Sequence, residues 1–93
     1  MIVLDVEATG VEHHKHSIVS VGALDIANPT NRFYMECRAW DGAHIMDEAL
    51  AVNGFSREEV TDPKKPSEAD LTHEFLRWSE SVAERTFAGQ NVS

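Results

Sequence analysis

The chain opens with MIVLDVEATG (residues 1–10), in which positions 2, 4 and 6 are apolar, whereas Asp5 and Glu7 occupy the alternate positions. An alternation with a period of two is typical of a β-strand, whose successive side chains point to opposite faces of the sheet. The pattern predicts a strand over residues 1–7 with one apolar face and with both carboxylates on the other face. Gly10 then ends the strand.

Three further strands follow from the same kind of pattern. Residues from about 17 to 26 are apolar on both faces, which favours a central position in a sheet. Residues 32–39 alternate, and the composition of Asn28-Pro29-Thr30-Asn31 predicts a turn before them. Residues 86–88 are short and apolar, consistent with a buried fourth strand. The first three strands are expected to form an antiparallel meander.

Helical signals fill the region between the third and fourth strands. Residues 47–52 read as a short helix that ends at Asn53-Gly54, a usual C-terminal stop. Ser56-Arg57-Glu58-Glu59 has the spacing of a capping box and opens a brief helical turn. A longer helix is expected over residues 67–85, beginning at a serine N-cap. Its apolar side chains share one helical face: Leu71, Phe75, Trp78 and Val82.

The order of these elements indicates an α/β fold of the type β-β-β-α-β. A helix between the third and fourth strands suits a crossover that returns the chain to the same sheet, so a mixed sheet is expected.

Length and composition limit the class of protein. Ninety-three residues form one small domain at most. There is no run of 18 apolar residues to span a membrane, and no secretion signal leads into the first strand. The single cysteine, Cys37, lies in an alternating apolar stretch and is expected to be a buried small residue in a reducing compartment. We therefore expect a cytoplasmic protein with no membrane partner.

The net charge of −8 is unusual for a simple nucleic-acid-binding module, because such modules contact phosphates through basic surfaces. The charge counts less against a metal-dependent nuclease. In such an enzyme, clustered carboxylates bind divalent cations, and the cations contact the phosphate.

Asp5 and Glu7 are the strongest candidates for chemistry. Two residues apart on a strand, they point to one face about 6–7 Å apart along the chain. Carboxylates this close repel each other unless a cation or a proton joins them. Their hard oxygen ligands suit Mg²⁺ or Mn²⁺, and a two-metal phosphodiesterase site needs roughly four acidic ligands, so the pair supplies about half of one. The competing interpretation is that the two carboxylates are only a solvated face of an edge strand. The adjoining Thr9-Gly10, which could approach a substrate, favours metal binding instead.

The segment Asp5-Val6-Glu7-Ala8-Thr9-Gly10 resembles the first motif of the DEDD 3′→5′ exonuclease superfamily, which includes proofreading subunits, ribonuclease T and oligoribonuclease. Three more segments are similar to the family in the right order. Residues 18–23 resemble its second strand, residues 53–60 the segment before its first long helix, and residues 89–93 the opening of its second motif. The resemblance spans essentially the whole chain and implies a ribonuclease H-like fold.

The resemblance also implies a mechanism: hydrolysis of phosphodiester bonds at the 3′ end of single-stranded nucleic acid, with two Mg²⁺ or Mn²⁺ ions. Asp5 and Glu7 would be the catalytic metal ligands, with Glu7 also near the attacking water. Substrate contacts are implied for four residues: Ala8, Thr9, Gly10 and Asn91. Thr9 would hold the terminal nucleotide through its hydroxyl or backbone. For Asn91, capping of a local turn is an equally good interpretation.

The sequence departs from the family pattern most seriously at its end. Ala8 replaces a common threonine and Gln90 a frequent histidine, which are mild changes. The chain stops at Ser93, before the second-motif aspartate and before the whole third motif with its general base. None of the histidines matches that context: His13, His14, His16, His44 and His73. We therefore expect residues 1–93 to be a single exonuclease-like domain that lacks the C-terminal part of the fold and is weakly active or inactive alone.

Two other classes of function stay open. The first is a non-catalytic module that binds nucleic acid or protein. The second is an oligomer, with another copy or a partner chain, that completes the metal site in trans.

Other conspicuous residues favour structural interpretations. A solvated hairpin loop is favoured over a transition-metal site for residues 13–16, because no second ligand cluster has suitable spacing. Phe75 and Trp78 lie at helical spacing, which indicates core packing rather than base stacking.

The remaining polar and aromatic candidates carry no motif. Lys64-Lys65 is too short for a phosphate-binding patch. For Glu36 and Asp41 a solvated surface position is favoured, and no role is assigned to Trp40.

Overall fold

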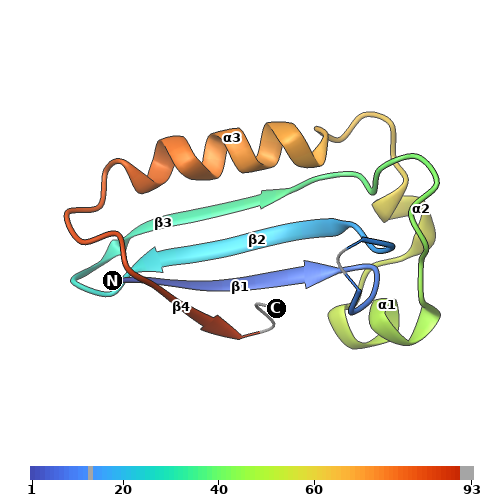
Figure 1. Cartoon of the computed structure of the whole chain (residues 1–93), viewed down its shortest axis with the longest axis horizontal. Helices are drawn as coiled ribbons and strands as arrows, with labels where there is room; N and C mark the ends of the chain where they lie inside the picture. The colour runs from blue at the N-terminus through green and yellow to red at the C-terminus, as the bar shows by residue number, and fades with distance from the viewer. Residues whose placement is uncertain (13, 91–93) are drawn as a thin grey trace.

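A four-stranded mixed sheet with the strand order β3-β2-β1-β4 forms the centre of the computed structural model, which describes residues 1–12 and 14–90 (Figure 1). The elements are, in chain order, β1 (Ile2–Ala8), β2 (Ile18–Asp25), β3 (Asn28–Glu36), α1 (Asp47–Asn53), α2 (Arg57–Val60), α3 (Glu68–Ser79) and β4 (Phe87–Gln90).

The strand pairing confirms the expected meander and crossover. β1 pairs with β2, and β2 with β3, in antiparallel orientation, whereas β4 pairs with β1 in parallel after the crossover through α3. β2 is central, as its two apolar faces predicted. β1 is also central, because it is hydrogen-bonded to β2 on one edge and to β4 on the other. Asp5 and Glu7 therefore do not belong to an edge strand.

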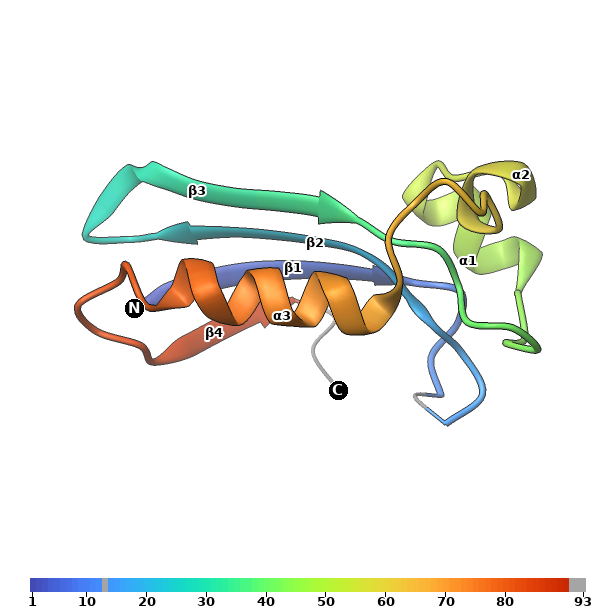
Figure 2. The ribbon, with the colours of Figure 1, turned by 90° about the horizontal axis from the view of Figure 1, so that it is seen from above.

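α3 covers one face of the sheet, as Figure 2 shows from above. The even-numbered apolar residues of β1 point to this face, where Ile2 is fully buried and Leu4 and Val6 pack against the core. Phe75 and Trp78 of α3 pack there against Phe33 of β3, with ring centroids 5.6 and 5.9 Å from the Phe33 ring. Core packing is thus confirmed for both helix aromatics.

Within the described part of the chain, no helix covers the other face of the four strands, which we call the open face (Figures 1 and 2). Strand alternation and the register between β1, β2 and β3 assign the following side chains to it: Val3, Asp5, Glu7, Ser20, Leu24, Arg32, Tyr34 and Glu36. Gly22 lies among them between Asp5 and Tyr34 in the register. Both predicted metal ligands are therefore on the face opposite α3.

α1 and α2 pack at the end of the sheet where β1 finishes (Figure 1). Val19 of β2, Leu50 of α1 and Val60 of α2 form a separate buried cluster there. The predicted helix signals are confirmed: Gly54 caps α1 in the left-handed conformation (φ 82°), and Ser56 begins α2 with a complete capping box. Ser67 caps α3 by accepting a hydrogen bond from the Asp70 N–H.

The hairpin between β2 and β3 differs from the prediction of a turn at residues 28–31. The turn is at residues 26–27, and β3 already begins at Asn28. Asp25 holds this tighter turn by accepting a hydrogen bond from the Ala27 N–H (3.0 Å). Pro29 is tolerated in a strand because β3 is at the sheet edge, where a missing N–H costs no ladder hydrogen bond.

β3 and α3 both end earlier than expected. The Cys37 N–H still donates to Val19 of β2 (2.9 Å), but the N–H groups of Arg38 and Ala39 donate to the carbonyls of Pro66 (2.9 Å) and Val60 (2.7 Å). α3 stops at Ser79 rather than near Arg85. The Ser79 and Ser81 hydroxyls donate to backbone carbonyls of the last helical turn, which favours helix termination. Val82 still enters the core, because a turn carries it back to the sheet.

The burial of Cys37 agrees with its position in an alternating apolar stretch. Cys37 is fully buried and unpaired, and its thiol donates to the Ile18 carbonyl (3.1 Å). No helix in residues 1–12 and 14–90 is long and apolar enough to cross a membrane.

The connection from β1 to β2 is packed tightly around Gly10. A Cβ atom at position 10 would overlap the imidazole ring of His16. His16 is buried, and its Nδ1 atom accepts a hydrogen bond from the Glu12 N–H (3.0 Å), so its ring has little freedom to move away. Glycine is therefore required at position 10 by the close approach of this ring.

Gly10→Ala is expected to lower the free energy of unfolding by about 1–3 kcal/mol, the usual cost of overpacking a buried contact. Gly22→Ala is the matched control, since a Cβ there meets its nearest atoms at ordinary distances of 3.7 and 4.0 Å. Urea denaturation of both variants and of Gly10→Ala/His16→Ala measures the effect. Equal stability of the two single variants would show that His16 does not restrict position 10.

Candidate functional site

Asp5 and Glu7 lie next to each other on the open face, in the half of β1 that leads to the first connection. Asp5 pairs with Gly22 and Glu7 with Ser20 of β2. Asp5 is exposed, whereas Glu7 is half-buried. β1 pairs with β2 along its whole length and with β4 over Ile2–Asp5, so β4 supports the strand at Asp5 but not at Glu7. Both carboxylates lie on one face of the strand, as the sequence predicted.

The electrostatic environment of Glu7 differs from that of a solvated surface acid. Partial burial raises the pKa of the Glu7 carboxyl, and the negative charge of Asp5 raises it further. Both effects disfavour a second negative charge at this place. The pair would be relieved by a proton or by a cation that binds both carboxylates.

The described residues supply this pair of acidic ligands but no larger cluster. In residues 1–12 and 14–90, no group of three or more His, Cys, Asp or Glu side chains could hold a metal ion. Two carboxylates fit Mg²⁺ or Mn²⁺ as a partial ligand set, since Mg²⁺ is often held by one or two carboxylates plus water and phosphate. The expectation of about half a two-metal site stays a prediction.

Thr9 is fully buried and holds the end of β1 to two other segments. Its hydroxyl donates to the His44 carbonyl (2.7 Å) and accepts from the Ser17 N–H (3.0 Å). Its backbone N–H donates to the Ser17 carbonyl (2.9 Å), and its carbonyl accepts from the Met46 N–H (2.8 Å). These contacts position the strand end, and the predicted contact of Thr9 with a nucleotide stays a prediction.

Two of the other predicted substrate residues, Ala8 and Gly10, flank Thr9 at the end of β1. The Ala8 carbonyl accepts a hydrogen bond from the Asn53 side chain (3.2 Å), which ties the end of α1 to β1. Gly10 follows directly and packs against His16. Asn91 lies outside the described residues. The structure thus brings Ala8, Thr9 and Gly10 to the end of the strand that carries the carboxylates.

The expectation of a solvated loop at residues 13–16 is wrong for His16. A turn in which the Lys15 and His16 N–H groups donate to the Glu12 carbonyl folds the loop back and buries the His16 ring. The ring also stands edge-on to that of His44, with centroids 6.2 Å apart. His13 lies outside the described residues. His16 therefore has a packing role that its polar neighbours in the sequence concealed.

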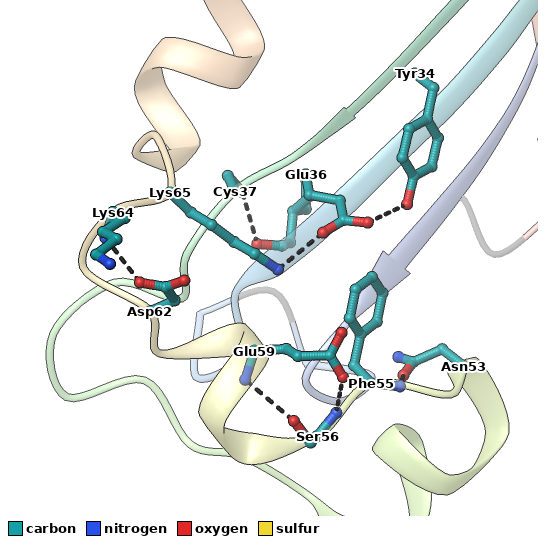
Figure 3. A network of polar contacts seen from close by, with 11 residues as sticks. Tyr34, Glu36, Cys37, Asn53, Phe55, Ser56, Glu59, Asp62, Lys64 and Lys65 are labelled. Carbon is teal, nitrogen blue, oxygen red and sulfur yellow. Dashed lines mark hydrogen bonds and ion pairs between the residues drawn. The ribbon is translucent and has the colours of Figure 1, made fainter.

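Glu36 is not simply solvated, as Figure 3 shows. It accepts hydrogen bonds from the Tyr34 hydroxyl (2.7 Å) and from the Lys65 ammonium (2.8 Å). These two bonds lower the pKa of the Glu36 carboxyl, the one from Lys65 contributing most. The Lys65 ammonium also lies 5.3 Å from the centre of the Phe55 ring.

Sequence reasoning overlooked this network, although strand alternation alone places Tyr34 and Glu36 on the face of the two carboxylates. Lys65 comes from a loop 29 residues further along the chain, and no local pattern links it to Glu36.

Similar folds occur among solved nuclease structures. The nuclease domain of 3′hExo, a DEDDh family member, bound to rAMP, is 15% identical with a TM-score of 0.65, and the match covers 95% of this chain and 48% of that one. Cell-death related nuclease 4 (CRN-4) is 13% identical with a TM-score of 0.63, covering 95% and 33%. A full-length 3′-exonuclease is 14% identical with a TM-score of 0.65, covering 95% and 32%.

At these identities the likeness establishes the fold, which is the ribonuclease H-like fold of DEDDh exonucleases. This chain spans half or less of the length of those proteins. No curated protein sequence matches it. The sequence does match the RNase_T exonuclease family over residues 2–90, almost its whole length. The chain therefore belongs to the RNase_T exonuclease family.

Proposed function

We propose that this chain provides the first half of the metal site of a 3′→5′ exonuclease domain, with Asp5 and Glu7 as ligands for Mg²⁺ or Mn²⁺. The observation that carries the proposal is the position of both carboxylates on the open face of the central strand β1. Membership of the exonuclease family and the raised pKa of Glu7 support it. The proposed substrate is the 3′ end of a single-stranded nucleic acid.

The polarity and the substrate class are supported by the solved structures of similar fold. One of these proteins was solved bound to rAMP, and another is described as a 3′-exonuclease that recognises the 3′ end of a histone mRNA stem-loop. A 3′-terminal nucleotide is thus the ligand we carry over to this chain. Bound divalent ions would stabilise the charge that develops on the phosphate during hydrolysis.

Two carboxylates are a weak site for a hydrated divalent ion, so we propose that the 93-residue chain alone hydrolyses nucleic acid slowly or not at all. Completion of the ligand set by another copy or by a partner chain is the alternative that keeps full activity. A non-catalytic binding module is the other alternative. Metal-dependent hydrolysis would distinguish either form of the nuclease from a binding module, which would not hydrolyse nucleic acid. Light scattering would distinguish a site completed by another copy or a partner chain from a monomer with half a site.

Mn²⁺ is expected to raise the Tm of the wild-type chain, because an ion that binds the folded state stabilises it by mass action. Asp5→Asn should abolish the rise, since it removes a charged ligand with little change of shape. Asp41→Asn is the control, as Asp41 is an exposed acid away from the strands. Differential scanning calorimetry with and without Mn²⁺ makes the comparison. The same rise in Tm for all three proteins would refute the ligand role of Asp5.

Glu7→Gln is expected to stabilise the metal-free chain at neutral pH. Because the pKa of Glu7 is raised on folding, the unfolded chain ionises first as the pH increases, and the folded state loses relative stability. The gain from Glu7→Gln should therefore be largest at neutral pH and should vanish as the pH falls below 4.5, the ordinary pKa of a glutamate carboxyl. Urea denaturation at several pH values tests this. A gain that does not depend on pH would contradict the electrostatic explanation.

Hydrolysis by the purified chain is expected to be weak, to require Mn²⁺ or Mg²⁺, and to shorten a 5′-labelled oligonucleotide from its 3′ end. Asp5→Ala should remove whatever hydrolysis is present. Gel electrophoresis of the labelled products reads both rate and polarity. Robust hydrolysis by a monomer, confirmed by light scattering, would overturn the proposal of half a site, and hydrolysis in EDTA would overturn the metal mechanism.

A further inference from the structure

Tyr34 is an exposed aromatic side chain on the open face, in line with Asp5 across the sheet. The register places Asp5, Gly22 and Tyr34 side by side on β1, β2 and β3. Tyr34 is 64% exposed, although it projects from a sheet rather than from a loop. A Cβ atom at Gly22 would lie 3.7 Å from Cδ1 of the Tyr34 ring, so the ring lies close to the bare backbone of β2. Its other side faces solvent.

The orientation of this ring is fixed by the network in Figure 3. The Tyr34 hydroxyl donates to Glu36, whose other carboxylate oxygen accepts from Lys65. Lys65 is in turn held over the Phe55 ring. An aromatic side chain held this way loses little conformational freedom when a ligand stacks on it, which favours binding.

An open hollow of about 670 Å³ lies beside the ring. Its lining includes Tyr34, the charged side chains of Asp5 and Arg32, and the apolar side chains of Val3 and Leu24. The volume is within the ordinary range for small-molecule sites. The lining offers an aromatic surface, an apolar floor and one cation, which together match the base, the sugar and the phosphate of a nucleotide.

The charges of the face argue against a second copy of this chain as the occupant. A protein interface over the hollow would remove Asp5 and Arg32 from water, which is costly unless both are paired. A nucleotide that stacks on Tyr34 leaves both charged groups at the rim, in water.

We propose that Tyr34 is a stacking platform for a base of single-stranded nucleic acid, with Arg32 facing a neighbouring phosphate. This role of Tyr34 extends the proposed function to a neighbouring nucleotide and rests on it. Tyr34 is two strand spacings from Asp5, about 9–10 Å across the sheet, so the stacked base belongs to a nucleotide next to the 3′ end that the carboxylates would receive.

The test measures binding of a short 5′-fluorescein-labelled single-stranded adenylate oligomer to the 93-residue chain by fluorescence anisotropy, in EDTA at low salt. Tyr34→Ala is expected to raise Kd by about fivefold to a hundredfold, the usual effect of losing one base stack. Tyr34→Phe keeps the ring and should recover most of the affinity. Leu76→Ala is the matched control, because Leu76 is 54% exposed on α3, at the opposite face.

A second measurement needs no variant. The chain contains a single tyrosine, so its ring signals can be assigned directly in an NMR spectrum. Stacking of a base should shift these signals upfield when the unlabelled oligomer is added. An unchanged Kd for Tyr34→Ala together with unshifted ring signals would overturn the platform.

The outcomes also separate this inference from the proposed function. Because the binding test is carried out in EDTA, failure of Asp5 and Glu7 to bind Mn²⁺ would overturn the metal site and leave the stacking result valid. Conversely, Mn²⁺ binding with no effect at Tyr34 would overturn the platform alone. A change of oligomeric state in Tyr34→Ala, seen by light scattering, would assign the face to a second copy and overturn the proposal.

Discussion

β1 pairs with β2 in antiparallel orientation along its whole length and with β4 in parallel orientation over Ile2–Asp5, and this pairing fixes which of its side chains face α3. A slip of one residue would place Asp5 and Glu7 under the helix and would expose Ile2, which is fully buried in the native register. Burying two unpaired carboxylates is far more costly than losing one apolar contact. The apolar pattern that drives the sheet onto α3 therefore also delivers both carboxylates to the open face.

The same arrangement works against stability at one place. Glu7 is drawn partly out of water beside Asp5, and both conditions raise its pKa, so the ionised pair is unfavourable in the folded chain. A bound cation would remove this cost, because the negative charge that destabilises the metal-free chain also attracts the cation.

Local patterns were sufficient for the alternation in β1 and for the caps at Gly54 and Ser56, because each depends on residues within one turn or strand. Composition did not reveal the short-range side-chain hydrogen bonds that move the turn before β3 and end α3 early.

Other predictions depended on tertiary structure. Pro29 is tolerated in β3 because, within the described residues, β3 is at the edge of the sheet, and His16 is buried because the loop folds back on Gly10. The family resemblance pointed to Asp5 and Glu7, whose role as ligands stays a prediction. It did not point to Tyr34, because the role that we propose for Tyr34 depends on its neighbours across the sheet.

The acidic surface limits how this chain could hold a nucleic acid. Most nucleic-acid-binding proteins contact phosphates largely through Lys and Arg. Their affinity for the nucleic acid therefore falls steeply as the salt concentration rises. Here the hollow beside the carboxylates has one cationic side chain, Arg32, in its lining. A divalent ion at Asp5 and Glu7 would supply further positive charge at the phosphate, and Tyr34 would supply an attraction that does not depend on charge. Binding built on one cation, one metal site and one stacked base should therefore depend strongly on divalent ions and only weakly on monovalent salt.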